Sequence, residues 1–207
     1  RPFDPPPLEL ALTADDHAVA RQWLDRHTHR GTVKIAFHPG SALFKNHIMK
    51  RWSHEKFAAL GRRLADEAGA DILVFGGPEE QGLKETVCRE AARPERCVSV
   101  DGTTLRQSAA ILAKCDILVS NDSALMHVSA AVGTPVVAIF AYTNSRALYP
   151  WHVPHRIVRK DLPCSPCFFY SPKSAFCHAG IDYECIRSIT VDEVHEAVID
   201  LLGETRG

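Results

Sequence analysis

The sequence lacks the features that mark several large classes of protein. No apolar run approaches the roughly 20 residues that cross a bilayer, and no charged start with an apolar stretch and a small-residue cleavage site marks a secretory signal. Net charge is nearly absent, because 24 Lys and Arg residues offset 25 Asp and Glu residues to leave −1. There is therefore no global basic field for nucleic acid, and anion binding has to come from the local placement of cations.

Two familiar phosphate-binding motifs are also missing. The sequence contains neither the Walker pattern of P-loop NTPases nor the G-x-G-x-x-G fingerprint of dinucleotide-binding proteins. Its composition, with 45% hydrophobic and 24% charged residues, is that of a globular protein that forms a core without disulfides or metals to stabilise it. We interpret residues 1–13, which begin in a Pro-rich stretch, as an interdomain linker. Residues 14–207 then form one domain of a longer protein.

Short apolar segments alternate with amphipathic ones along most of the chain. The apolar segments predict strands at Val33–Phe37, Ile72–Phe75, Cys97–Val100, Ile117–Ser120, Pro135–Phe140 and Arg156–Arg159. The amphipathic segments predict helices at Ala14–His27, His54–Ala68, Glu80–Ala91, Leu105–Ala113, Ala124–Val132 and Val191–Leu202. Short strands rich in β-branched residues are typical of a parallel sheet covered by helices on both faces. We therefore predict a doubly wound, mostly parallel, Rossmann-like α/β fold, whose ligands bind at the carboxyl ends of the strands.

The loop after the first predicted strand carries groups that suit a diphosphate. It reads His38-Pro39-Gly40-Ser41, and Lys45, His47, Lys50 and Arg51 follow before Trp52. Backbone N–H groups approach a phosphate closely at glycine, and lysine supplies a point charge. A solvated basic loop is the alternative, and the residues alone do not separate the two.

Two further loops offer single polar groups. Glu79 follows Gly76-Gly77-Pro78 at a helix start, where a carboxylate accepts hydrogen bonds from a ribose diol in dinucleotide sites. Complementing the positive end of that helix is the plainer role, and from these residues alone we favour it. Thr143, after the fifth predicted strand, adds a hydroxyl to the same edge, unless its loop is a simple turn.

The loop after the fourth predicted strand is the most informative one. Ser120-Asn121-Asp122-Ser123 leads directly into a helix, so Asp122 or Ser123 caps the helix and its free N–H groups favour a phosphate. His127 lies about one helical turn beyond Ser123 on the same face and can reach the same anion. A capped helix with a packed core histidine is the alternative. The neighbouring cationic loop favours a phosphate site, with His127 as a candidate phosphate stabiliser.

The cysteines divide into two groups. Cys88, Cys97 and Cys115 stand singly in segments predicted to be buried, whereas Cys164, Cys167, Cys177 and Cys185 cluster late. The Cys-x2-Cys element suits a tetrahedral zinc, but the second pair is spaced too widely for a standard zinc ribbon. We therefore expect reduced or occasionally paired thiols in a cytoplasmic setting rather than structural zinc.

Taken together, these residues resemble a known family. The motifs are His38-Pro39-Gly40, Lys50-Arg51-Trp52, Phe75-Gly76-Gly77, Ser120-Asn121-Asp122-Ser123-x-x-Met126-His127, Gly133-Thr134-Pro135 and the knuckle from Pro163 to Cys167. In order and spacing they resemble the C-terminal domain of glycosyltransferase family 9, the ADP-heptose:lipopolysaccharide heptosyltransferases. The resemblance runs from about Leu8 to Leu202.

The resemblance implies a two-domain GT-B enzyme. Its C-terminal half holds the activated sugar, usually ADP-heptose, and its N-terminal half binds the acceptor and carries the general base. The matching positions imply that Ser41 and Lys50 contact the diphosphate, Glu79 the ribose and Asp122 the sugar. They also imply that Ser123, Ala124 and His127 line the phosphates and that Leu125 packs on the base. Transfer with inversion and without a required cofactor or metal is implied as well. Ala124 departs from the family, which usually has glycine there.

We therefore predict the donor-binding domain of a glycosyltransferase that transfers heptose from ADP-heptose to the lipopolysaccharide core. The expected partners are the nucleotide sugar and, through the absent N-terminal domain, the lipopolysaccharide-core acceptor, with no nucleic acid and no transmembrane segment. We expect a cytoplasmic location, with any peripheral contact to the inner membrane made by the full-length protein. The alternatives are a family relative that uses another NDP-sugar and a degenerate, non-catalytic binding or scaffold module.

Overall fold

The strands form one parallel sheet. The structure, a computed structural model, describes residues 5–169 and 173–206, and residues 1–4 of the predicted linker lie outside this range. The strands are β1 (Lys34–His38), β2 (Asp71–Val74), β3 (Cys97–Ser99), β4 (Ile117–Asn121), β5 (Val136–Ile139) and β6 (His155–Val158). Neighbours pair in parallel in the order β3-β2-β1-β4-β5-β6. This confirms the predicted doubly wound fold. The winding reverses between β1 and β4, the point where such sheets bind ligands.

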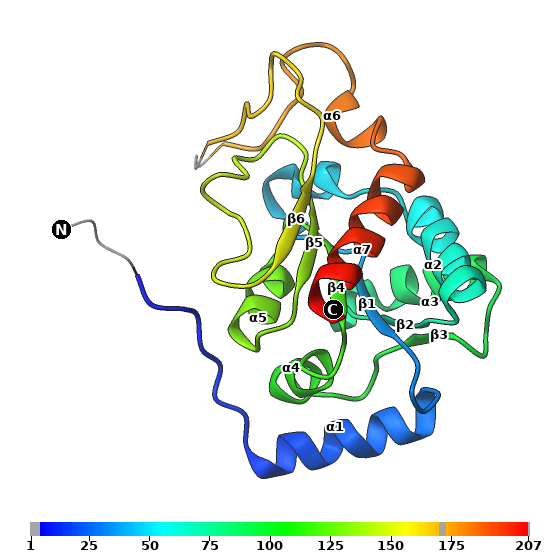
Figure 1. Ribbon diagram of the computed structural model, residues 1–207. Helices are drawn as coiled ribbons and strands as arrows, with labels where there is room; N and C mark the ends of the chain where they lie inside the picture. Colours follow the sequence, from blue (N-terminus) through cyan, green and yellow to red (C-terminus); the bar gives the residue numbers. More distant parts are fainter. Residues whose placement is uncertain (1–4, 170–172, 207) are drawn as a thin grey trace.

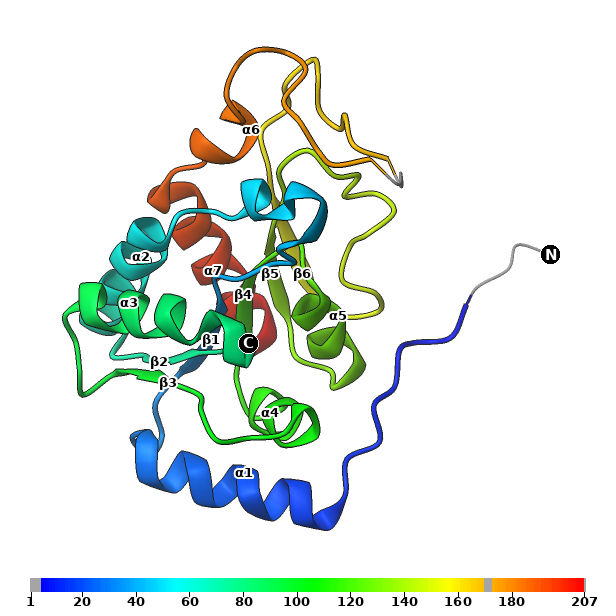
Figure 2. The same cartoon turned by 180° about the vertical axis from the view of Figure 1, so that it is seen from behind.

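Helices cover both faces of the sheet (Figures 1 and 2). The main helices are α1 (Ala14–His27), α2 (His54–Ala68), α3 (Gln81–Ala91), α4 (Leu105–Leu112), α5 (Ala124–Ala131) and α7 (Val191–Arg206). Side chains of α1, α4 and α5 share one core cluster, and those of α2, α3 and α7 share the other. The predicted helices are confirmed with small shifts at their ends. Within residues 5–169 and 173–206, no helix has both the length and the apolar character needed to cross a membrane.

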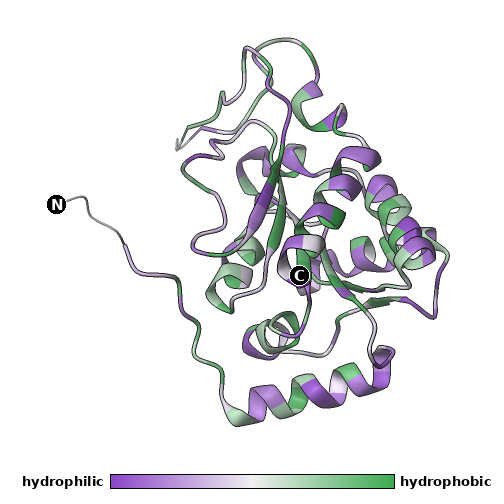
Figure 3. Ribbon diagram, viewed as in Figure 1, coloured by the Kyte–Doolittle hydropathy of each residue, from purple (hydrophilic) through white to green (hydrophobic). Residues whose placement is uncertain are grey.

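The pattern of the strands explains why both faces are covered. Ile35 and Phe37 of β1 pack into the core cluster of α2, α3 and α7, whereas Ala36 packs into the opposite cluster. All three side chains are fully buried. Colouring by hydropathy shows apolar strands along the centre of the molecule and polar stretches on the outer sides of the helices (Figure 3). A strand buried on both faces has to be apolar at every position, which is why these segments show no alternation.

The pattern of apolar and polar residues does not predict three short helical elements. They are the 3-10 helix η1 (Phe44–Lys50), the 3-10 turn η2 (Pro78–Glu80) that leads into α3, and α6 (Glu184–Arg187). In η1, Lys45 and Asn46 have φ angles of 53° and 61°, in the left-handed region, so no regular periodicity marks this stretch. Tertiary contacts hold it instead, because the Asn46 amide donates to the Ala175 carbonyl at 2.9 Å.

The caps of the helices follow the predictions in part. Thr190 and Glu193 form a reciprocal pair of hydrogen bonds at the start of α7. Gly69 ends α2 in the left-handed conformation, with φ of 58°. Ser53 and Ser123 occupy the N-cap positions of α2 and α5, but neither side chain makes a capping hydrogen bond. The expected side-chain cap of α5 by Asp122 or Ser123 is therefore not formed, and the Ser123 hydroxyl has another partner, His38.

Candidate functional site

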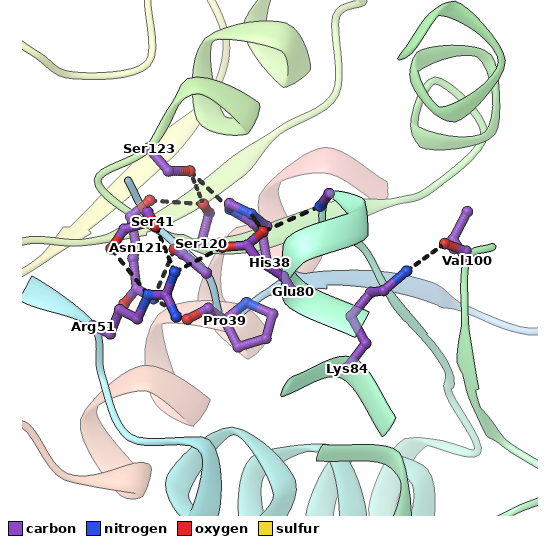
Figure 4. Close-up of polar contacts among 12 residues, drawn as sticks. His38, Pro39, Ser41, Arg51, Glu80, Lys84, Val100, Ser120, Asn121 and Ser123 are labelled. Atoms are coloured by element: carbon purple, nitrogen blue, oxygen red, sulfur yellow. Dashed lines mark hydrogen bonds and ion pairs between the residues drawn. The ribbon is translucent and has the colours of Figure 1, made fainter. Parts of the chain in front are cut away.

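Asn121 fixes the first loop to the end of β4. Its side chain is fully buried, and its amide donates to the carbonyl of Pro39 at 2.8 Å while its oxygen accepts from the backbone N–H of Trp52 at 2.9 Å. The Trp52 indole in turn donates to the Ile189 carbonyl at 2.9 Å. The loop from β1 to α2 is thus fastened at both of its ends, so the side chains that it carries are held at the β1–β4 reversal (Figure 4).

Lys50, Asp122 and Thr143 come from three different loops and meet at one carboxylate oxygen. Lys50 Nζ donates to Asp122 Oδ2 at 2.7 Å, and Thr143 Oγ1 donates to the same atom at 2.8 Å. The side chains of Lys50 and Asp122 are 11% and 7% exposed. Their pairing lets both charges stay close to the protein interior, where a lone charge is strongly disfavoured. The structure therefore brings together three of the residues that the sequence analysis selected.

A second polar cluster is formed around Glu80, with Arg51 and His38 turned toward its carboxyl group (Figure 4). Glu80 accepts from Arg51 Nη2 at 2.9 Å through Oε1, and its Oε2 lies 3.2 Å from His38 Nε2. Burial opposes ionisation of Glu80, but the hydrogen bond with His38, the backbone N–H of Gly77 and the charge of Arg51 outweigh it and hold the pKa of this carboxyl below its usual value. A Cβ atom on Gly40 would stand 1.9 Å from Glu80 Oε1, so glycine is required for this close approach.

The hydroxyl groups of Ser41 and Ser123 are engaged within these clusters. Ser41 Oγ donates to the His47 carbonyl at 2.9 Å and accepts from Arg51 Nε at 3.1 Å. Ser123 Oγ lies 2.8 Å from His38 Nδ1. Because Ser123 turns toward His38, its hydroxyl leaves the first backbone N–H groups of α5 without a side-chain cap. Such N–H groups are the usual partners of a phosphate at a helix start.

The remaining predicted residues lie on the open side of this region. Glu79 and Ala124 are exposed, and Leu125 and His127 are half-buried. Across residues 5–169 and 173–206, no hydrogen bond to the His127 ring is formed. A cavity of about 510 Å³ lies elsewhere, at the β6 edge, where Tyr149, His155 and Arg159 are among its lining residues. It includes none of the predicted site residues.

His38 and Arg51 belong to the loop expected to suit a diphosphate, but neither they nor Glu80 were predicted as individual site residues. The missed signal is the run from Gly77 to Glu80, in which the acidic residue reaches back to the Gly77 N–H at 3.2 Å, the pattern of a helix start. That pattern turns Glu80 inward and leaves its neighbour Glu79 outside. Burial, together with the charge of Lys50, lowers the pKa of His47, a further ionisable side chain of the first loop.

The charges of this arrangement are balanced. Lys50 and Arg51 are each paired with a carboxylate, so the resting site needs no counter-ion. The uncapped N–H groups at the start of α5 are of the kind that bind a phosphate at a helix start. A doubly wound parallel sheet with such a loop at its reversal point defines an α/β domain of the nucleotide-binding type.

The comparisons place the chain within this class. Residues 2–175 match the model of glycosyltransferase family 9 (heptosyltransferase), and the chain belongs to that family. It is 32% identical over 130 residues to lipooligosaccharide heptosyltransferase 2 of Haemophilus influenzae, and 32% identical over 128 residues to lipopolysaccharide heptosyltransferase 2 of Escherichia coli. Each match covers 60% of this chain and 36% of the relative. The resemblance seen in the sequence is thereby confirmed.

Solved structures give the same result for the fold. The ADP-heptose heptosyltransferase II of E. coli matches over 96% of this chain and 54% of its own, with a TM-score of 0.73 and 22% identity. A family 9 glycosyl transferase from Veillonella parvula matches over 95% of this chain and 54% of its own, with a TM-score of 0.79 and 24% identity. The 207 residues thus span about half the length of these relatives or less.

Proposed function

We propose that this chain holds the nucleotide-sugar donor of a glycosyltransferase that transfers heptose from ADP-heptose to the lipopolysaccharide core with inversion. The observation that carries the proposal is the meeting of Lys50, Asp122 and Thr143 where the β1 and β4 loops converge. The two curated relatives described above are both heptosyltransferases 2, which favours heptose over other sugars.

Each side chain has a role that follows from its place. Lys50, Ser41 and the first N–H groups of α5, from Ser123 and Ala124 onward, receive the diphosphate, and His127 adds a donor one turn along the helix. Asp122 accepts from the sugar, and Thr143 orients Asp122. Glu79, which is exposed, is free to accept from the ribose, while Leu125 packs against the base. Glu80 stabilises the loop from within by holding Arg51 and His38.

The chemistry assigned to these residues is stabilisation of the leaving diphosphate. As the bond from the anomeric carbon to the diphosphate breaks, negative charge grows on the phosphate oxygens. The helix N–H groups stabilise that charge, and Lys50 joins them once the donor has drawn it away from Asp122. We assign the acceptor site and the general base that deprotonates the acceptor hydroxyl to residues outside these 207, in keeping with the length of the relatives.

Nucleotide binding tests the proposal on this chain directly. Isothermal titration calorimetry with ADP, UDP and GDP should give the tightest binding for ADP, by about tenfold or more, if the base is recognised as adenine. Inorganic pyrophosphate should bind more weakly than ADP, because it lacks the groups that would contact Glu79 and Leu125. A preference for UDP would contradict the ADP-heptose donor. If none of these ligands bound at about millimolar concentration, the site itself would be misassigned.

A further inference from the structure

His38 connects a buried carboxyl group to the start of α5. It is the last residue of β1 and is 7% exposed, and its two ring nitrogens face different partners. Nδ1 lies 2.8 Å from Ser123 Oγ, and Nε2 lies 3.2 Å from Glu80 Oε2. Figure 4 shows the ring between the hydroxyl group and the carboxyl group. A single imidazole therefore links Glu80 to the helix start at which we place the diphosphate.

The carboxyl group of Glu80 decides which nitrogen of His38 carries a proton. Burial opposes its ionisation, but the hydrogen bond with His38, the Gly77 N–H and the charge of Arg51 keep its pKa below the usual value, so it is ionised at neutral pH. An ionised carboxylate only accepts hydrogen bonds, so Nε2 of His38 has to be the donor. In a neutral imidazole Nδ1 is then an acceptor, and the Ser123 hydroxyl donates to it.

The direction of the Ser123 hydroxyl therefore depends on the charge of His38. While the ring is neutral, the hydroxyl hydrogen points inward, and only lone pairs of the oxygen are left to face a phosphate, which they repel. When Nδ1 is protonated it becomes a donor to Ser123 Oγ, and the hydroxyl hydrogen is released to point elsewhere. Ser120 Oγ, at 3.1 Å, can accept it, because the hydroxyl hydrogen of Ser120 goes to the Asn121 carbonyl at 2.7 Å.

A bound diphosphate changes this balance. A phosphate oxygen is charged and accepts a hydrogen bond more strongly than a neutral hydroxyl does. It therefore favours the state in which His38 is protonated and Ser123 donates outward. The added positive charge then lies between the Glu80 carboxylate and the diphosphate, so it is attracted from both sides.

We propose that His38 is a positioning residue that takes up one proton when a diphosphate binds at the start of α5, and that it thereby turns the Ser123 hydroxyl toward a phosphate oxygen. The role rests on the proposed function, because it needs a diphosphate at this helix start. The proton comes from solvent, adds to the Nδ1 lone pair and returns to solvent when the nucleotide leaves, so no bond between heavy atoms forms or breaks. The charge that it adds, next to Ser123, also helps to stabilise the leaving diphosphate.

Several other titratable groups surround His38. Glu80 contacts it directly and also pairs with Arg51, while Lys50 and Asp122 neutralise each other. The neighbouring elements add His47 of η1, Glu79 of η2, Lys84 of α3 and His127 of α5. Of these four, the two histidines belong to the residue type that titrates near neutral pH. A proton taken up by His38 therefore has to be distinguished from one taken up by either of them.

The direction of Ser123 supports this role over a purely structural one. Thr13 and Thr104 stand at the same N-cap position of α1 and α4, and their hydroxyl groups accept from the backbone N–H three residues on, at 3.2 and 3.3 Å. A hydroxyl that serves only to begin a helix is expected to do the same. Ser123 instead keeps its hydroxyl on His38 and leaves the first N–H groups of α5 to a ligand.

The test counts the protons that accompany nucleotide binding. Calorimetric titration with ADP in buffers of different ionisation enthalpy gives the number of protons taken up per ADP. His38→Gln keeps a donor and an acceptor on the side chain but has no titrating group. Near neutral pH the wild type should take up more protons than this variant, by about one, whereas protonation of ADP itself is common to both and cancels. Its affinity should also gain about tenfold more than that of the variant when the pH is lowered from about 8.5 to 6.

Two further variants locate the proton. Ser123→Ala removes the group through which His38 acts, so proton uptake should fall to the level of His38→Gln. His29→Gln is the matched control, because His29 also pairs with a carboxylate, that of Asp71 at 2.8 Å, but at the amino end of β2. It should leave the proton count and the affinity unchanged. NMR spectra of the histidine rings should show that the His38 ring gains a proton at saturating ADP, which distinguishes it from the histidines of η1 and α5.

The outcomes separate the role of His38 from the donor site itself. If ADP binding depended on Lys50 but the wild type and His38→Gln took up equal numbers of protons, the donor site would stand and the role of His38 would be structural only. Full proton uptake in Ser123→Ala would show that His38 does not act through Ser123, which overturns the proposal as well. If the chain bound no nucleoside diphosphate, the proposed function would fail and the role of His38 with it. Should His38→Gln fail to fold, as judged by circular dichroism, the NMR titrations of the wild type and of Ser123→Ala decide.

Discussion

The polar site between β1 and β4 lies at the same end of the sheet as a thiol cluster, Cys164, Cys167, Cys177 and Cys185, that lines a small cavity with Tyr142, but the two regions are held in different ways. In the polar site, the charged side chains are already paired: Lys50 with Asp122, and Arg51 with Glu80. In the thiol cluster, burial and mutual proximity disfavour thiolates at Cys167 and Cys185. The first site is arranged by ion pairs between its own side chains, whereas the four thiols of the second are all free. Preorganisation of this kind is what a site needs to stabilise developing charge.

The largest effect should come from breaking the Lys50–Asp122 pair. Asp122→Ala leaves a nearly buried ammonium group without its partner, so we expect the free energy of unfolding to fall by about 3 kcal/mol. Urea denaturation followed by circular dichroism measures this loss. Asp192→Ala is the matched control, because Asp192 is 88% exposed and pairs with Arg63 on the surface. That change should cost less than about 1 kcal/mol. Equal effects of the two substitutions would show that the pair in the site is not organised as described.

The next effect concerns the ligand rather than the fold. Lys50→Ala should weaken ADP binding by roughly 1.5–3 kcal/mol, the range for a charge-assisted hydrogen bond to a phosphate. Calorimetric titration gives the ratio of affinities. Lys114→Ala removes the same charge from an exposed position at the end of α4 and should leave the affinity unchanged. If the affinity for ADP were also unchanged in the Lys50 variant, Lys50 would pair with Asp122 without contacting the ligand.

The third effect is a pH dependence of stability that originates at Glu80. Its pKa is lowered in the folded chain, so its contribution to stability is complete above the unfolded-state pKa and is lost as the pH falls through the folded-state value. Stability should therefore fall as the pH is lowered below about 4.5. Glu80→Gln should reduce this slope, as followed by urea denaturation between neutral and acidic pH. Glu79→Gln, at the exposed neighbouring position, should leave the slope unchanged. If stability fell with the same slope in the wild type and in Glu80→Gln, an ionised Glu80 would not contribute to the stability of the site.

The contrast between the two regions also explains what the sequence could and could not predict. Strands such as Ile117–Asn121 are visible because burial on both faces demands a run of apolar residues. The pairing of Lys50 with Asp122 is foreseeable in outline, because the fold places both loops at one edge. The choice of Glu80 over Glu79 is not, since it depends on a single turn at η2. Cys177 and Cys185 line the same cavity, and the chain between them turns at Asp182 and Tyr183. The positive φ angles of these two residues cannot be predicted from a side-chain pattern.

The smallest effect tests whether the open side of the polar site is where the diphosphate lies. Ala124 is exposed at the first position of α5, where the family usually has glycine, so its methyl group stands close to the proposed path of the phosphates. Ala124→Gly should tighten ADP binding by less than about tenfold, because one crowded contact is relieved while no charge is added. Stability should fall by only a few tenths of a kcal/mol, since the residue lies in the first turn of a short helix. Ala131→Gly, at the far end of the same helix, controls for the loss of helix propensity. If the first substitution weakened binding while the second left it unchanged, the methyl group would pack against the ligand rather than crowd it. If neither substitution changed the affinity, the donor would lie farther from α5 than we propose.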